Sequence, residues 1–224
     1  MKVLIFGEQN SELQVLLDTH GFEVVESNPD VVISYGGDGA LLKSEHAYPQ
    51  IPKLLLRNSK ICKLCSPLPN ELVLEKIANG SYTIDEVWKI EGKFHDQTIT
   101  ALNDIVVHNA DPRHAIRYHV WVNEKQVGDH VIGDGIVIAN PLGSTGYYRS
   151  ITHSFFEVGM GLAFNNSTET SDHMILQEDS SIRISIIRGP AFLYADNQIE
   201  RIQLADHNEV LIKKSDTSAR IIRV

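Results

Sequence analysis

The chain has 224 residues and a formal net charge of −9, and 42% of its residues are hydrophobic. This composition is typical of a globular protein with one large or two small domains. An acidic surface repels a phosphate backbone, so we expect no nucleic-acid partner. No apolar run approaches the roughly 18 residues that a membrane span needs, and the run near Met1 is too short for a secretory signal, so we expect a cytoplasmic protein with no membrane partner.

The first third of the chain alternates predicted strands and helices. Apolar and β-branched runs predict strands at 2–6, 22–26, 30–34 and 51–57. Helical spacing predicts helices at 11–20 and 70–80, each ending near a glycine. Such strands suit a parallel sheet that is covered on both faces. Residues 1–84 are therefore predicted to form an α/β domain with a mostly parallel sheet.

Beyond residue 84 the pattern changes to alternation with a period of two. The segments 84–109, 114–140 and 181–224 alternate apolar and polar residues between short polar turns. One helix is predicted in this half, beginning near Ser144. Residues 85–224 are therefore predicted to form a β-rich, antiparallel, sandwich-like domain.

A glycine-rich turn follows the predicted strand at 30–34. Gly36, Gly37 and Gly39 leave backbone N–H groups bare, so a phosphate could approach them closely, and the following helix would add its positive end. Asp38 within this turn could bind Mg²⁺ or accept a proton from an attacking hydroxyl. A plain strand-to-helix turn, with glycines at positive φ and Asp38 as the N-cap, would explain the same residues. Neither the P-loop nor the Rossmann spacing occurs.

A second motif lies at residues 134–149. A predicted strand ends in Asn-Pro, and a Gly-Ser-Thr-Gly turn leads into the predicted helix. Ser144 and Thr145 would place hydroxyls and amides at the helix start, where they could contact an anion or a ribose. Tyr147 offers a face on which a base could stack. Alternatively, Ser144 and Thr145 cap the helix and Tyr147 packs in the core.

A polar pair, Asn103-Asp104, interrupts the apolar alternation of the segment 98–109. Polar side chains in such a place must find hydrogen-bond partners. Ribose hydroxyls suit them, because the carboxylate can accept hydrogen bonds from both hydroxyls and the amide can pair with the remaining donor or acceptor. A turn at the end of a strand, with the two side chains bonded to nearby backbone, is the alternative.

Two further sets of residues could bind metal. Cys62 and Cys65 match half a zinc site or a redox pair, but no second Cys/His pair has finger-like spacing. We therefore interpret them as reduced thiols. The ten histidines are expected on surfaces and turns, with a metal site at His108, His114 and His119 as the alternative.

Together these motifs resemble the NAD kinase family, in order and in approximate spacing, across nearly the whole chain. The family carries G-G-D-G-T followed by two leucines, where this chain has Gly36 to Leu42. It carries an Asn-Glu pair, matched by Asn103-Asp104, and D-G-x-x-x-x-T-P-T-G-S-T-A-Y, matched by residues 134–147. A pair of asparagines, Asn165-Asn166, is similar to another element of the family.

The resemblance implies phosphorylation of the adenosine 2′-hydroxyl of NAD to give NADP, with ATP or polyphosphate as donor. Mg²⁺ would be the cofactor, held mainly by substrate phosphates, and Asp38 would be the general base. The family's oligomers imply a homo-oligomer, either a dimer or a tetramer. The residues implied at the donor phosphates are Gly36, Gly37, Gly39 and Lys43. Those implied at NAD are Asn103, Asp104, Ser144, Thr145 and Tyr147, with Asp134 at the nicotinamide end, often from a neighbouring subunit.

The chain departs from the family pattern in several places. Ala40 replaces threonine, Asp104 replaces glutamate, and Leu142 replaces a second threonine. Residues 57–64 replace the family's Asn-x-Gly-x-Leu-Gly-Phe-Leu segment, which normally shapes the dinucleotide pocket. Two alternatives therefore stay open: an NAD(P)-binding sensor without turnover, and a related small-molecule or lipid kinase that shares the G-G-D-G motif.

Overall fold

The computed structural model describes residues 1–8, 11–169 and 171–224. The chain forms two compact units, Met1–Val87 with Ser218–Val224, and Trp88–Thr217. The boundary predicted from the sequence was a single one, near residue 84. The C-terminal residues belong to the first unit because the end of β16 (Glu209–Arg223) pairs in parallel with β4 (Lys53–Arg57), with Ile221 opposite Lys53. Pairing between distant segments of this kind leaves no local pattern in the sequence.

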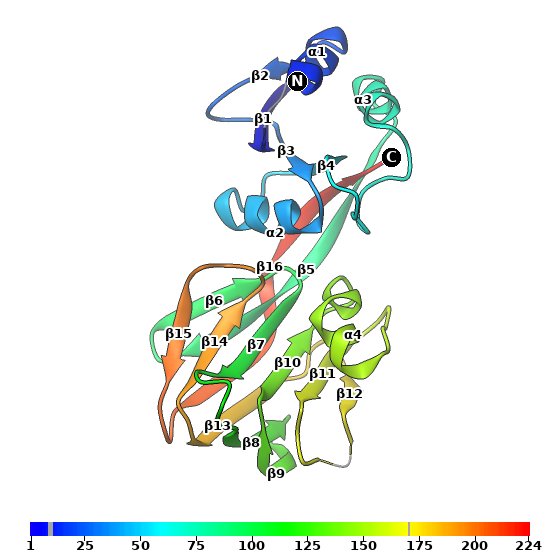
Figure 1. Ribbon diagram of the computed structural model, residues 1–224. Coiled ribbons are helices and arrows are strands. Elements are labelled where there is room, and N and C mark those ends of the chain that lie inside the picture. Colours follow the sequence, from blue (N-terminus) through cyan, green and yellow to red (C-terminus); the bar gives the residue numbers. More distant parts are fainter. Residues whose placement is uncertain (9–10, 170) are drawn as a thin grey trace. The chain divides into compact units, whose positions relative to one another are not determined.

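The first unit is an α/β layer structure, as predicted. Its parallel sheet has the strand order β2-β1-β3-β4 (Figure 1). Besides β4, the elements are β1 (Lys2–Gly7), α1 (Ser11–Thr19), β2 (Glu23–Val24), β3 (Val31–Gly36), α2 (Asp38–Ala47) and α3 (Asn70–Ala78).

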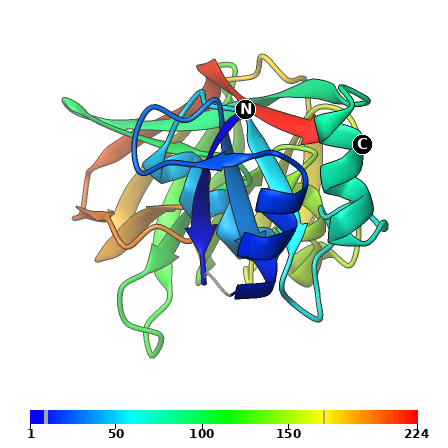
Figure 2. The same ribbon diagram turned by 90° about the horizontal axis from the view of Figure 1, so that it is seen from above.

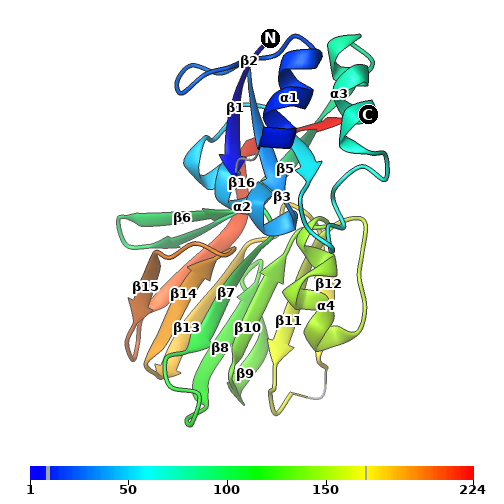
Figure 3. The same cartoon turned by 45° about the horizontal axis from the view of Figure 1, so that its top comes forward.

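Alternation along β3 explains the layers of this unit. Ile33 packs in one core with Leu17 of α1 and Leu74 of α3. Ser34 points to the opposite face, where its Oγ lies 2.6 Å from Ser44 Oγ in α2. Figures 2 and 3 show α1 and α3 beside one another on the same side of the sheet. Both faces are covered, which is why these strands read as continuous apolar runs.

A buried ion pair joins α2 to the start of β4. Lys53 Nζ lies 2.6 Å from Glu45 Oε2, with side-chain exposures of 0% and 3%. The same ammonium group donates to the backbone oxygens of Tyr48 and Ile51, each at 2.6 Å. All three protons of the ammonium group therefore have acceptors, as a charge in this environment requires.

The second unit is an antiparallel β-sandwich, which confirms the predicted fold class. One sheet has the strand order β12-β11-β10-β7-β14-β15, and strands β16, β13, β8 and β9 form the other with the β5–β6 hairpin. The core consists of inward-facing residues from both sheets. The remaining strands are β5 (Thr83–Phe94), β6 (Gln97–Ala101), β7 (Asp104–Asn109), β8 (Ile116–Val122), β9 (Lys125–Gly133), β10 (Gly135–Ala139), β11 (Met160–Asn165), β12 (His173–Leu176), β13 (Ile182–Arg188), β14 (Ala191–Ala195) and β15 (Arg201–Leu204).

A short helix covers the outer face of the six-stranded sheet. The helix predicted near Ser144 consists of a 3-10 turn, η1 (Gly143–Thr145), followed by α4 (Tyr147–Thr152). Tyr148 of α4 is fully buried against Val106 and Val137 of the sheet. Over the described ranges, every helix is too short or too polar to cross a lipid bilayer.

The buried ion pair yields a stability prediction. In Lys53→Met, the carboxylate of Glu45 stays buried without its cation, so we expect the free energy of unfolding to fall by about 3–5 kcal/mol. The measurement is urea denaturation followed by circular dichroism. Lys53→Met/Glu45→Leu removes both charges and should recover most of the loss. A single variant within about 1 kcal/mol of wild type would contradict the prediction.

Candidate active site

The G-G-D-G turn joins β3 to α2. Gly37 is the N-cap of α2 with φ −121°, no side chain caps the helix, and Asp38 is its first residue. The alternative of positive-φ glycines with Asp38 as the N-cap is therefore wrong. Gly37 is needed for space, since a Cβ there would lie 2.9 Å from the backbone oxygen of Ile61. The turn is thus packed against the loop that follows β4.

That loop holds the carboxylate of Asp38. The backbone N–H of Leu64 donates to Asp38 Oδ1 at 2.9 Å, and that of Lys63 donates to Oδ2 at 3.1 Å. A carboxylate has about four lone pairs, so about two remain for other partners. Asp38 is therefore oriented by backbone and can still accept a proton or a hydrogen bond.

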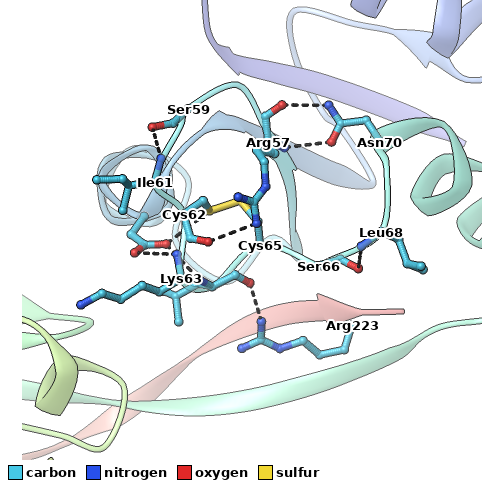
Figure 4. The surroundings of a disulfide bond; sticks show 12 residues. Arg57, Ser59, Ile61, Cys62, Lys63, Cys65, Ser66, Leu68, Asn70 and Arg223 are labelled. Atoms are coloured by element: carbon cyan, nitrogen blue, oxygen red, sulfur yellow. Dashed lines mark hydrogen bonds between the residues drawn. A yellow bond between two sulfur atoms is a disulfide. The ribbon is translucent and has the colours of Figure 1, made fainter.

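Cys62 and Cys65 are joined by a disulfide, with their Cα atoms 5.5 Å apart (Figure 4). The interpretation as reduced thiols is therefore wrong. CxxC spacing alone does not distinguish reduced thiols from a disulfide, because the local fold determines whether the two sulfur atoms come close enough to bond. The bridge closes the turn that contains both amides bound to Asp38. Arg57 donates to the Cys62 oxygen at 3.3 Å and Arg223 to the Leu64 oxygen at 3.1 Å, so two side chains hold the same turn.

Lys43 lies on an exposed part of α2. It follows Asp38 by five residues, so it projects about 140° around the helix from Asp38. The two side chains therefore do not share a face, and the contact of Lys43 with donor phosphates stays a prediction.

In the second unit, the carboxylate of Asp196 organises the turn before β7. It accepts hydrogen bonds from the backbone N–H groups of Leu102, Asn103 and Asp104, at 2.6, 2.7 and 3.2 Å. Asp196 was not among the site residues predicted from the sequence. Its only sequence signal was a place in a polar turn of the alternating segment 181–224, and in the structure it adopts φ +49°. Asp196 thus positions both residues of the predicted Asn-Asp pair.

Asp104 begins β7 and is 8% exposed. Burial, and to a smaller extent the negative charge of Asp196, raise its pKa to about 7. Burial also raises the pKa of Asp196, although the three backbone N–H groups and Lys89 oppose that effect. Near neutral pH the carboxyl group of Asp104 can therefore both donate and accept a hydrogen bond.

A pocket of about 300 Å³ opens on the outer face of the six-stranded sheet. Alternation places Asp104, Val106 and His108 of β7 on this face. Tyr147 is 37% exposed and lines the pocket, so the alternative in which it packs in the core is wrong. The lining residues are Asp104, Val106, His108, Tyr147, Tyr194 and Asp196.

A polar network connects Tyr147 with Asp134. Asn165 Nδ2 donates to the Tyr147 hydroxyl at 3.0 Å, and Asn166 Nδ2 donates to Asp134 Oδ2 at 3.0 Å. Asn109 Nδ2 donates to Asp134 Oδ1 at 3.2 Å. Burial raises the pKa of Tyr147, and the charge of Asp134 raises it further. The structure therefore brings both predicted residues into one region of the second unit.

Ser144 and Thr145 differ in what they can offer a ligand. Ser144 is fully buried, and its Oγ lies 2.7 Å from the Pro141 oxygen and 2.9 Å from the Phe156 oxygen. A single hydroxyl proton can donate to only one of these acceptors, and both are internal. Thr145 is half-buried and lines a separate pocket of about 350 Å³ with Leu142.

Asn140 stands where the family pattern has threonine, and it has a structural role. It is fully buried, and its Nδ2 donates to the backbone oxygens of Trp88 and Leu102 at 2.8 and 2.7 Å. Its Oδ1 accepts from the Gly143 N–H at 2.9 Å. One side chain thus ties η1 to the turn before β7.

The three histidines predicted as an alternative metal site do not come together. His108 lines the pocket, and His114 lies 3.4 Å from Asp111. His119 instead approaches Asp129, with its Nδ1 3.0 Å from Asp129 Oδ1. The three histidines do not meet because His108 is on β7 and His119 is on β8, and these two strands belong to different sheets.

The raised pKa of Asp104 predicts how stability depends on pH. The pKa of about 7 exceeds the unfolded value of 3.8, so the stabilising contribution is complete below about pH 4 and lost as pH rises through 7. Asp104→Asn stays neutral, so its stability relative to wild type should increase by up to about 4 kcal/mol from pH 4 to pH 8. Urea unfolding across this range measures it. The exposed Asp96→Asn is the control, and parallel pH profiles for wild type and Asp104→Asn would contradict the prediction.

Comparison with known proteins agrees with this architecture. A model of the ATP-NAD kinase C-terminal domain matches residues 102–224, more than half of the chain. The NAD kinase of Methanothermobacter thermautotrophicus is 24% identical over 218 residues, covering 93% of this chain and 76% of that protein. The NAD kinase of Thermococcus gammatolerans is 29% identical over 210 residues, with coverage of 88% and 74%.

Two solved structures share the fold. An NAD kinase from Archaeoglobus fulgidus in complex with ATP superposes with a TM-score of 0.84 at 21% identity, covering 99% of this chain and 93% of that one. Yeast NADH kinase complexed with NADH superposes with a TM-score of 0.85 at 16% identity, covering 100% and 83%. The family match over more than half of the residues, together with the two-unit fold, shows that the chain belongs to the NAD kinase family.

Proposed function

We propose that this protein phosphorylates the adenosine 2′-hydroxyl of NAD to give NADP, with Asp38 as the general base. The observation that carries the proposal is the placement of Asp38. It begins α2 within the glycine-rich turn, and two N–H groups orient its carboxylate while lone pairs stay available. Family membership supports NAD as the acceptor.

The second unit offers a pocket suited to a nucleoside. Asp104 can accept from one ribose hydroxyl and donate to another group, because its pKa lies near neutrality. Within the described residues, Oδ1 of the adjacent Asn103 is buried without a hydrogen-bond partner, so a contact with the sugar would require this side chain to turn toward the pocket. The ring of Tyr147 stands at the edge of the pocket, where a base could stack.

In the reaction, the 2′-oxygen forms a bond to the terminal phosphorus of the donor, and the bond from that phosphorus to its leaving oxygen breaks. The proton of the 2′-hydroxyl passes to the carboxylate of Asp38. A positioned base of this kind contributes roughly 10²- to 10⁴-fold to the rate. The glycine amides of the turn would stabilise charge on the transferred group.

The donor is ATP or polyphosphate, and the family description favours ATP. The residues present fit Mg²⁺, because this ion usually binds one or two carboxylates together with substrate phosphates, and Asp38 has lone pairs to offer. Mg²⁺ would neutralise charge on the phosphates. Asp38 would hold the ion at the helix start, directly or through a bound water.

Replacing Asp38 tests the proposal. Asp38→Asn keeps the shape of the side chain but removes the base, so we expect kcat to fall by about 10²-fold or more, while the KM for NAD changes little. Purified protein would be incubated with NAD, Mg²⁺ and either ATP or polyphosphate, and NADP would be read with an NADP-specific dehydrogenase. Asp96→Asn is the control, and EDTA should abolish turnover.

Unchanged turnover in Asp38→Asn would remove this residue from the mechanism. Absence of NADP with either donor, together with saturable NAD binding by calorimetry, would identify a sensor instead. Turnover of a lipid or another small alcohol in place of NAD would identify a different kinase.

The disulfide gives a second prediction about turnover. The bridge closes the turn that holds Asp38, so Cys62→Ser/Cys65→Ser should let that turn move and lower kcat by roughly 10-fold, with little change in the KM for NAD. Dithiothreitol should lower kcat of the wild type in the same way and leave the double variant unaffected. Equal kcat with and without the bridge would show that the backbone contacts alone orient Asp38.

A further inference from the structure

The hairpin formed by β8 and β9 carries a cluster that the proposed reaction does not use. His119 of β8 and Asp129 and His130 of β9 each offer one ligand atom, and these three atoms lie within 4.8 Å of one another. Within the described ranges, this is the one group of three His, Cys, Asp or Glu side chains arranged in this way. Both strands belong to the second unit.

A β-bulge creates the cluster. Tyr118 pairs with Val131, but Val120 pairs with Gly128, so the single residue His119 stands opposite both Asp129 and His130. Successive residues of a regular strand would point to opposite faces. Here His130 adopts φ +52°, and both Asp129 and His130 are exposed on the outer face. Bulges commonly re-aim side chains in this way beside functional sites.

The distances fit a first coordination shell. His119 Nδ1 and His130 Nδ1 each lie 3.0 Å from Asp129 Oδ1. The two imidazole rings meet edge to face, with centroids 4.7 Å apart. In a tetrahedral zinc site, ligand bonds of about 2.0–2.1 Å place neighbouring ligand atoms about 3.3 Å apart. Small side-chain rotations would therefore be enough to admit the ion.

Hydrogen-bond donors now occupy the acceptor atoms of the cluster. The backbone N–H of His130 donates to His119 Nδ1 at 3.2 Å. Gln126 Nε2 lies 3.3 Å from the same nitrogen and 3.1 Å from Asp129 Oδ1, so its amide can serve both atoms. A metal ion bound at His119 Nδ1 would take the place of these donors, because the nitrogen has a single lone pair.

We propose that this cluster, His119, Asp129 and His130, binds a divalent transition-metal ion of the zinc type. Two imidazoles and one carboxylate suit Zn²⁺, whereas Mg²⁺ and Ca²⁺ prefer shells of oxygen atoms. Three protein ligands leave a position for water or for a ligand from another molecule. The site therefore differs in chemistry from the Mg²⁺ site proposed at Asp38.

Calorimetry on the metal-free protein tests this proposal. The protein would be treated with EDTA, desalted without reductant so that the disulfide persists, and titrated with ZnCl₂. We expect one ion to bind per chain, and the affinity to fall by at least about 10-fold in His119→Ala and in His130→Asn. Asparagine tolerates the positive φ at residue 130. The control is His95→Asn, an exposed histidine that also has a positive φ, 51°.

Tryptophan fluorescence gives a second readout, independent of calorimetry. The ring of Trp121 lies 5.5 Å from that of His119, so Cu²⁺ or Ni²⁺ bound at the cluster should quench the fluorescence of Trp121. The quenching should be lost in His119→Ala, while circular dichroism shows that the variant is folded. No saturable binding, or the same affinity in wild type and in both histidine variants, would overturn the proposal.

Discussion

The candidate nucleoside pocket depends on one carboxylate that accepts three consecutive backbone N–H groups. Asp196 holds the turn at residues 102–104, and two other parts of the chain pack against this turn. The Asn103 oxygen accepts the Asn140 N–H at 3.1 Å, and a Cβ on Gly143 would lie 2.1 Å from that oxygen. Asn140 then ties η1 to the same turn through its amide. Asp196 therefore acts together with Asn140 and with the pairing of β7 and β10 to position Asn103 and Asp104.

This arrangement has an electrostatic consequence. Satisfying the turn requires a buried carboxylate at Asp196, and this carboxylate raises the pKa of the neighbouring Asp104, which burial has already raised. Asp38 has a different environment, since two backbone N–H groups donate to its carboxylate and it stands at the start of a helix. The first unit thus holds a carboxylate that backbone N–H groups orient, and the second unit holds a buried carboxyl group that can carry a proton near neutral pH.

Most regular elements could be predicted from the sequence because they depend on local pattern. The strands β1, β3 and β4 and the helix α3 lie where apolar runs and helical spacing placed them, and the change to alternation correctly marked the β-rich half. The motif at Asp38 and the pair at Asn103-Asp104 were recognisable because their residue types recur in a known order. The disulfide was not predicted, because CxxC spacing is compatible with thiols, a bridge or metal. The grouping of His119 with Asp129 and His130 was also missed, because a bulge in strand pairing has no simple sequence signature.

The fold class, the order of elements and the family could be read from the sequence, because they depend on hydrophobic periodicity and on short motifs. Which side chains act together became clear only from the folded chain. Asp196 reaches the turn at 102–104 across more than ninety residues of sequence, and residues 62–65 close over Asp38 from another loop. Ser144 and Tyr147 are only three residues apart, but Ser144 is buried inside the protein and Tyr147 lines a pocket. They belong to separate short helical segments, η1 and α4. The physical reason is that hydrogen bonds and burial depend on distance in space, which local pattern does not encode.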